Sequence, residues 1–342
     1  MTAVLRTGPV SLRVVPRVAV VSAVLLLAVL AVGVASLMTG DIELTASEVI
    51  ASLVGHGDRA SDFIVLRLRL PRVLCALFVG AALAASGAIL QSLTRNPLGS
   101  PEFIGMTNGA ATGAICVMFF LQGSMMMIAA GAFVGGVVTT VVVYLLAMKR
   151  GVQGFRLVLV GIGVSFILVA VNHFLITRAS IYEALQAQAW LVGGLNLRTW
   201  GHVTTAGVGL AVLLPVAVSL GRRLALLEMG DQAAQGLGVN VERSRFFLLG
   251  TSVGLASVAT AAAGPISFVA LAAPQLARKL TRSAGPGVFA AALMGAVLLM
   301  ASDLLLQRVF SVQLPVGIVT GAVGGVYLAW LLAHEWRKGI AR

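Results

Sequence analysis

The segment between Arg72 and Arg95 carries no charged side chain, and this feature constrains the fold more than any other in the chain. A helix needs about 20 apolar residues to cross the hydrocarbon core of a bilayer. Much of the segment's interior is glycine, alanine and serine, small residues that let a second helix backbone come close within a membrane. The sequence therefore predicts a membrane-spanning helix that packs against protein more than against lipid.

Apolar runs of similar length recur throughout the 342 residues. The chain is 59% hydrophobic and 11% charged, whereas an ordinary soluble domain is about 25% charged. We predict an all-α polytopic membrane protein whose residues 1–342 form a single transmembrane domain of about ten helices. The first run is longer than the core of a signal peptide and is taken as a span. The expected spans are 17–39, 70–93, 103–121, 124–148, 156–177, 201–220, 245–263, 265–281, 287–307 and 314–333.

The net charge of +12 indicates membrane topology rather than nucleic-acid binding, because the basic residues are scattered between apolar runs. Short cytoplasmic loops are enriched in Lys and Arg. Most basic residues fall at the two termini and in the loops after even-numbered spans, so both termini are predicted to be cytoplasmic. The longest outer loop is then 40–66, which is either a solvated connector or carries a short amphipathic helix near Ser47 and Glu48. The longest inner loop is 221–245.

The segment from Asn96 to Glu102 interrupts the apolar pattern between the second and third spans. Pro97 disfavours a helical Asn96, and Ser100 is a good N-cap for a helix that has Pro101 at its first position. A structured polar turn is therefore expected to join the two spans.

The inner loop 221–245 contains the signals of two short helices. Asp231 can cap the first, Gly238 is a natural helix stop, and Asn240 can cap a second that has Glu242 in its first turn. Two short helices on the cytoplasmic face would form a docking platform. The alternative is an ordinary solvated loop.

The nucleotide-binding and zinc-protease motifs are absent from the chain. Without a G-x-x-x-x-G-K-[ST] sequence the chain lacks the loop that cradles nucleotide phosphates, and it has no H-E-x-x-H sequence of the kind that binds zinc in metalloproteases. Cys75 and Cys116 lie in apolar runs and are expected to be buried, so no metal or cofactor is predicted. Asp303 is the only acidic residue within the expected spans, near Gln307 and Arg308, which indicates a local ion pair and argues against a proton- or sodium-driven carrier.

Several motifs together resemble the FecCD-type permeases, the membrane subunits of binding-protein-dependent ABC importers for iron-siderophores, haem and vitamin B12. The stretches 226–245 and 313–326 are most similar to a permease subunit of ferric enterobactin importers. Gln275 departs from the pattern, because the family commonly has histidine after the proline. The motifs are Arg69-Leu-Pro-Arg72, Asn96-Pro-Leu98 with Pro101 and Ile104-Gly105, Trp190 with Gly193-Gly194, the coupling-loop residues named below, Gly264-Pro265, Ala273-Pro274 and Gln313 to Gly317.

This resemblance implies a type II ABC importer permease fold with inverted repeats, located in the bacterial cytoplasmic membrane. It implies a second permease, as a homodimer or a paralogous heterodimer, two ATPase subunits inside and a siderophore-binding protein outside. The expected cargo is a ferric siderophore, with haem or cobalamin as the alternative. The chain itself would be a transport subunit without catalytic residues.

The resemblance also implies roles for particular residues. The turn formed by Asn96, Pro97 and Leu98, with the fifth and tenth spans, is expected at the inner gate and pathway. Arg69, Arg72 and Arg308 are expected to dock the binding protein, unless they pair with acids of loop 40–66 or reach lipid phosphates. The residues expected to contact the ATPase are Gly230, Asp231, Ala233, Ala234, Leu237, Gly238, Val239, Glu242 and Arg243.

Two expected spans carry small residues at every fourth position, a pattern that predicts close helix contacts. They are Gly131 with Gly135 in the fourth span, and Gly317, Gly321 and Gly325 in the tenth. The sequence leaves open whether these contacts lie within the chain or at a subunit interface.

Overall fold

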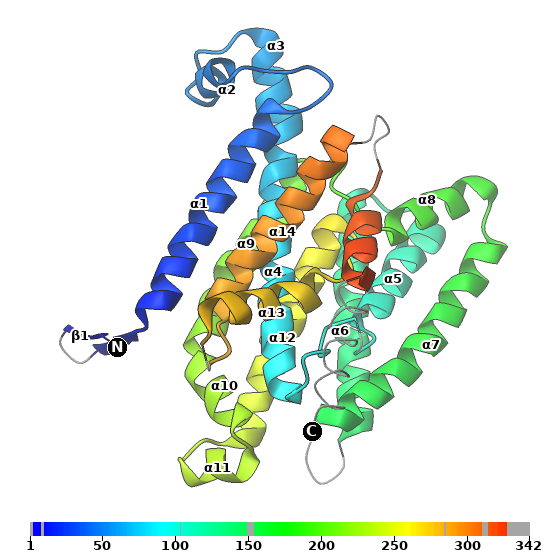
Figure 1. Ribbon diagram of the computed structural model, residues 1–342. Coiled ribbons are helices and arrows are strands. Elements are labelled where there is room, and N and C mark those ends of the chain that lie inside the picture. The colour runs from blue at the N-terminus through cyan, green and yellow to red at the C-terminus, as the bar shows by residue number, and fades with distance from the viewer. Residues whose placement is uncertain are drawn as a thin grey trace.

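The computed structural model describes residues 3–7, 10–102, 104–148, 154–283, 285–309 and 314–326. In these ranges the chain is helical apart from one N-terminal hairpin, in which β1 pairs antiparallel with β2 (Figure 1). The strands are β1 (Ala3–Thr7) and β2 (Val10–Val14). The helices are α1 (Pro16–Met38), α2 (Ala46–Leu53), α3 (Arg59–Asp62), η1 (Phe63–Arg69), α4 (Leu70–Thr94), α5 (Met106–Cys116), η2 (Val117–Leu121), α6 (Met125–Ala147), α7 (Gly154–Arg178), α8 (Ile181–Leu191), α9 (Trp200–Ser219), α10 (Gly221–Glu228), α11 (Asp231–Gly236), α12 (Val241–Ala263), α13 (Val269–Thr281) and α14 (Val288–Val309), followed by a short helix at Val316–Val326.

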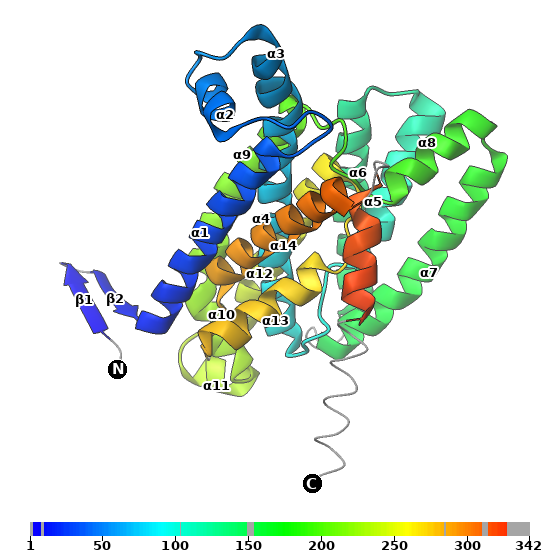
Figure 2. The same cartoon turned by 45° about the horizontal axis from the view of Figure 1, so that its top comes forward.

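Helix α4 lies at the centre of the molecule, with α1 and α7 on opposite sides of it (Figures 1 and 2). It packs against α9, α12, α13 and α14, and every residue from Val79 to Leu93 is buried. This confirms the prediction that the small-residue segment between Arg72 and Arg95 contacts protein rather than lipid. By contrast α7 is largely unburied, as expected for an apolar helix at the periphery of a membrane protein.

Seven helices in the described part of the chain are long and apolar enough to cross a membrane. The other three expected spans coincide with shorter helices. Residues 106–121 form α5 and η2, the eighth span is the 13-residue α13, and the tenth is described only over Val316–Val326. The all-helical fold class is confirmed, although three of the ten expected spans are shorter helices where the structure describes them.

Pairs of glycines set two of the close helix contacts. A Cβ atom on Gly80 of α4 would collide with the carbonyl of Gly295 on α14, and the reverse also holds. Gly131 and Gly135 of α6 meet Gly113 and Gly109 of α5 in the same way, so the predicted contact of the fourth span lies within the chain.

The glycines of the C-terminal helix behave differently. Gly317 packs against the carbonyl of Val192, whereas a Cβ atom added to Gly321 or Gly325 would meet no described atom within 4 Å. These two glycines thus leave an uncovered face on the helix.

The end of the molecule that carries α2 and α3 lies opposite α10 and α11 (Figures 1 and 2). Helix α2 forms within the expected outer loop, and Thr45 and Glu48 cap its start reciprocally. The short amphipathic helix considered for this loop is therefore present. Helix α1 begins at the end of the molecule where α10 and α11 lie.

Candidate functional site

The expected inner loop folds into α10, α11 and the start of α12 at one end of the molecule, and this segment is called the platform below. Gly230 and Gly238 have φ angles of 111° and 81°, which favour glycine, and they lie on either side of α11. The Asn240 side chain accepts a hydrogen bond from the Arg243 N–H at 3.0 Å and caps α12. The predicted stop and second cap are therefore present, but the helix that Asn240 caps is the long span α12, which begins earlier than expected.

Asp231 is not the N-cap of α11. The cap position is Gly230, and Asp231 lies in the first turn, where its charge faces the positive end of the helix. Both carboxylate oxygens of Asp231 accept hydrogen bonds from Nη2 of Arg245, at 2.8 and 3.0 Å. Arg95, at the end of α4, lies 3.8 Å from the same carboxylate. Asp231 thus connects α11 to α12 and to the end of α4.

Two large apolar side chains are exposed on this platform, Met229 at 68% and Leu237 at 61%. Glu242 and Arg243 are exposed beside them, whereas Ala234 is buried beneath. Apolar side chains at an otherwise polar end of a membrane protein are typical of a surface that a partner covers.

The turn after α4 is held by hydrogen bonds at both ends. Arg95 adopts the left-handed conformation that ends α4, and the Asn96 side chain accepts the N–H of Leu98 at 2.9 Å. Gln275 of α13 donates its side-chain amide to the Pro97 carbonyl at 2.7 Å. The predicted polar turn is therefore present and is fixed to α13.

The expectation that Ser100 caps a helix starting at Pro101 is wrong. Helix α5 begins at Met106 after Gly105, whose φ angle is 79°. Pro101, Glu102, Ile104 and Gly105 lie in turns, and the Glu102 carboxylate accepts the backbone N–H of Phe268 at 2.9 Å. Burial raises the pKa of this carboxyl to about 7, and the hydrogen bond from Phe268 acts in the opposite direction.

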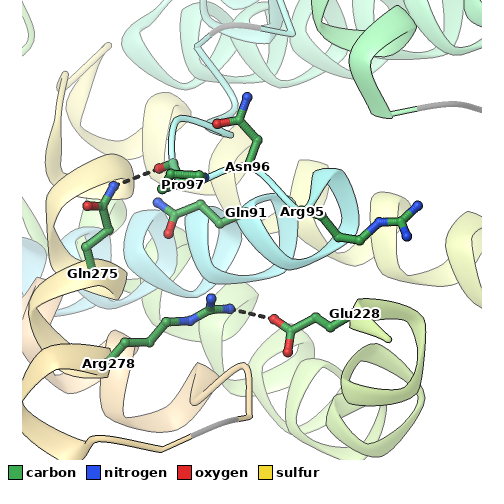
Figure 3. Close-up of a pocket in the computed structure, with 7 residues that line it drawn as sticks. All are labelled: Gln91, Arg95, Asn96, Pro97, Glu228, Gln275 and Arg278. Carbon is green, nitrogen blue, oxygen red and sulfur yellow. Dashed lines mark hydrogen bonds and ion pairs between the residues drawn. The ribbon is translucent and has the colours of Figure 1, made fainter. Parts of the chain in front are cut away.

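A cavity of about 360 Å³ lies between the turn and the platform (Figure 3). Side chains of α4, α10 and α13 line it, and an ion pair between Arg278 and Glu228 crosses one side at 2.7 Å. The lining residues are Gln91, Arg95, Asn96, Pro97, Glu228, Gln275 and Arg278.

Glycine motifs from three distant parts of the sequence meet near the other end of α12. Gly193 packs against the Pro265 carbonyl, the Gly194 N–H donates to Ala263 at 2.9 Å, and Gly317 reaches the Gly193 carbonyl at 3.4 Å. Arg198 reinforces the junction by donating to the Gly194 carbonyl at 2.9 Å. These motifs build a close backbone contact, which explains why they require glycine.

The three arginines expected at the outer surface are placed differently from one another. Arg69 is only 9% exposed and donates to the carbonyls of Leu37 and Ile42. Arg72 makes a two-pronged ion pair with Asp303, with both bonds at 2.8 Å. Arg69 and Arg72 thus both make contacts within the chain, and their role in docking a binding protein stays a prediction. Arg308 is exposed and contacts only the Thr39 hydroxyl among described residues.

Sequence reasoning missed the residues that bind the turn and the platform to α13, among them Gln91, Glu102, Glu228 and Arg278. Their partners lie far away along the chain, so no local motif identifies them. The sequence did carry one signal of such contacts. Arg278 and Lys279 lie in the last turn of α13, where a membrane span would be expected to stay apolar.

A polytopic helical fold with a buried central helix, a polar turn at its end and a platform with exposed apolar side chains defines a membrane transport protein. Residues 24–334 match the model of the FecCD transport family, and the chain belongs to that family. The chain is 46% identical over 323 residues to the ferric enterobactin transport system permease protein FepG of Escherichia coli (strain K12), covering 94% of this chain and 98% of that protein.

Two further comparisons agree with this assignment. A siderophore transport system permease protein, YfhA of Bacillus subtilis (strain 168), is 39% identical over 294 residues, covering 83% of this chain and 86% of the relative. The solved structure of a metal-chelate type ABC transporter in an inward-facing conformation superposes with a TM-score of 0.83 at 27% identity, covering 92% of this chain and 99% of the other. The resemblance and the fold expected from it are confirmed.

Proposed function

We propose that this chain is the permease through which a ferric siderophore enters the cytoplasm of a bacterium, driven by ATP hydrolysis on a separate subunit. The observation that carries the proposal is the 46% identity to a ferric enterobactin permease over 94% of the chain. Another relative, 38% identical over 91% of this chain, is a permease for achromobactin transport in Dickeya dadantii (strain 3937).

The platform is the surface proposed to contact the ATPase. Its exposed Met229 and Leu237 supply apolar area, and its charged rim at Glu242 and Arg243 supplies orientation. With the platform inside, α1 also begins inside and loop 40–66 lies outside. The remaining residues assigned to this contact are Gly230, Asp231, Ala233, Ala234, Gly238 and Val239.

A second permease, identical or paralogous, would complete the pathway. The open face of Gly321 and Gly325 supports a close contact there, because nothing described in this chain covers it. The turn at Asn96, Pro97 and Leu98 is the proposed inner gate.

A siderophore-binding protein is proposed to dock at the end that carries α2 and α3. Of the three arginines expected at the outer surface, Arg308 is best placed for this role because its side chain is exposed. Arg69 and Arg72 also hold the outer ends of α1, α4 and α14 together.

Uptake by a reconstituted importer tests this function. The permease, its paralogous partner where there is one, and its ATPase are reconstituted in liposomes with the binding protein outside, and radiolabelled iron is supplied as ferric enterobactin, as haem or not at all. Accumulation of the ferric siderophore only with internal ATP and the binding protein is expected. Haem uptake without siderophore uptake would assign the other cargo, and uptake driven by a proton gradient without ATP would overturn the proposal.

A further inference from the structure

Helix α13 contacts two parts of the proposed machinery. One is the turn at Asn96, Pro97 and Leu98, called the gate turn below, and the other is the platform, through α10. Gln275 and Arg278 lie one turn apart and therefore share a face of this helix. Figure 3 shows Gln275 directed at the turn after α4 and Arg278 directed at α10. A displacement of α13 must therefore change the position of the turn, of α10, or of both.

The connection between α13 and the turn is made at both ends of the turn. Gln275 holds the Pro97 carbonyl at 2.7 Å, and Glu102 holds the Phe268 N–H at 2.9 Å, directly before α13 begins. Gln91, in the last turns of α4, donates to the Leu271 carbonyl at 3.0 Å. These bonds are formed by partly or fully buried groups, so breaking one leaves a polar group without a partner, which is unfavourable.

The connection between α13 and the platform is the Arg278 side chain. Its Nη2 atom donates to Glu228 Oε1 at 2.7 Å and to the Ser92 hydroxyl at 2.6 Å. Glu228 is the last residue of α10 and is separated from α11 by Met229 and Gly230 alone. Arg278 thus links α13 to the end of α10 and to α4, the helix that precedes the turn at Asn96–Leu98.

A second link exists but is weaker. Arg95 and Asp231 lie 3.8 Å apart with side chains 49% and 39% exposed, whereas Arg278 and Glu228 lie 2.7 Å apart with side chains 35% and 19% exposed. The Arg278–Glu228 pair is therefore shorter and less exposed, and long ion pairs between exposed side chains contribute little. The cavity beside Arg278 also leaves space in which the side chains can move.

We propose that Arg278 is a positioning residue that transmits the movement of the ATPase platform to the gate turn through α13, with Glu228 as its partner. The proposal rests on the proposed function, since it requires an ATPase to move the platform. A shift of α11 and α10 displaces Glu228, the ion pair carries Arg278 and α13 with it, and Gln275 and Glu102 then reposition the turn.

The test measures coupling, in the complete importer reconstituted with its ATPase and binding protein. Glu228→Gln and Arg278→Gln remove the charges while keeping hydrogen-bonding side chains. ATP hydrolysis per complex is expected to stay within about twofold, while siderophore imported per ATP falls roughly tenfold, the factor that corresponds to one lost charge-assisted hydrogen bond. Arg282→Gln is the matched control, because it removes an exposed charge at the residue directly after α13.

The double variant separates transmission from general damage. If Glu228 and Arg278 act as a unit, the double variant imports as well per ATP as either single variant. Losses that multiply in the double variant, a normal import-to-ATP ratio in both single variants, or an equal loss in Arg282→Gln would each overturn the inference. Failure of the unaltered complex to import siderophore would instead count against the proposed function.

Discussion

At the scale of single residues, the buried ion pair between Arg72 and Asp303 shows what the sequence could and could not predict. The apolar context of Asp303 indicated that its charge must be compensated locally, and Gln307 does donate to it at 2.9 Å. The main partner, however, is Arg72 of α4 and not the neighbouring Arg308. Which arginine pairs with Asp303 depends on how α4 crosses α14, and the spacing of residues along the sequence does not reveal that crossing.

Removing one partner of this pair should destabilise the protein strongly. The Asp303 side chain is 4% exposed and that of Arg72 is 18% exposed, so Asp303→Asn leaves a buried arginine charge without a counter-ion. The expected loss is about 3–5 kcal/mol, and a double change to Arg72→Met with Asp303→Leu should lose much less. Denaturation midpoints of the purified protein in detergent measure this. Arg308→Gln serves as an exposed control, and equal midpoints for Asp303→Asn and Arg308→Gln would contradict the argument.

Glu102 gives a pH dependence with a definite sign. Its pKa rises from 4.5 in a free chain to about 7 in the fold, so the folded protein retains a proton that the unfolded chain has lost. The raised pKa lowers the free energy of unfolding once Glu102 must ionise. This loss of stability is absent below pH 4.5, grows between pH 4.5 and about 7, and is complete above about 7.

Replacement of Glu102 by Gln keeps an acceptor for Phe268 and removes this loss of stability. The variant's thermal midpoint should therefore exceed that of the parent at about pH 8 and approach it at about pH 5. Each kcal/mol of stability regained should raise the midpoint by roughly 2–4 °C. Glu43→Gln, at an exposed outer-loop glutamate, should show no such difference. A gain for Glu102→Gln that is the same at both pH values would show that ionisation is not its cause.

At the scale of elements, helix composition predicted close packing, and the structure shows which helices meet. The glycines of α4 and α6 indicated that another backbone would approach, and it does. Caps were predictable where the signal is local, as at Asn240 and Gly238. Asp231 and Ser100 were assigned wrongly because each has the right residue type for a cap, while its neighbours place it inside a turn or beside Arg245.

The contact between Gly80 and Gly295 should not tolerate a side chain on either helix. A Cβ on Gly295 would collide with backbone atoms of α4, which cannot move aside as a flexible side chain can. Gly295→Leu should therefore prevent accumulation of monodisperse protein in detergent extracts, as judged by size-exclusion chromatography. Gly163→Leu on α7, where a Cβ meets no described atom within 4 Å, is the control. Normal yield of Gly295→Leu would mean that α4 and α14 can separate without loss of the fold.

At the scale of the whole molecule, hydropathy and composition were sufficient for the class, the helical architecture and the family resemblance. They could not distinguish the seven long spans from short helices such as α13, because an enclosed helix needs apolar residues just as a crossing one does. The orientation in the membrane remains a prediction from charge. Its support is that α1 begins at the same end of the molecule as α11.

Cysteine labelling in intact cells and in inverted vesicles tests this orientation. In a chain whose Cys75 and Cys116 are replaced by alanine, His56→Cys should react only from outside and Gln235→Cys only from inside, because both side chains are exposed at opposite ends. Cysteines at positions 2 and 341, which lie outside the described residues, should react from inside. Reaction of positions 2 and 341 on opposite faces would require an odd number of spans.

The exposed Met229 and Leu237 also bear on how the cell controls the amount of this protein. If the ATPase covers them as proposed, a newly inserted chain without its ATPase displays these apolar side chains to the aqueous compartment, the feature that chaperones and quality-control proteases recognise. Chains made in excess should be degraded, so the ATPase supply would fix the number of permeases that persist. Pulse-chase labelling should give a shorter half-life without the ATPase gene than with it, and Met229→Gln with Leu237→Gln should lengthen the half-life of the orphan chain.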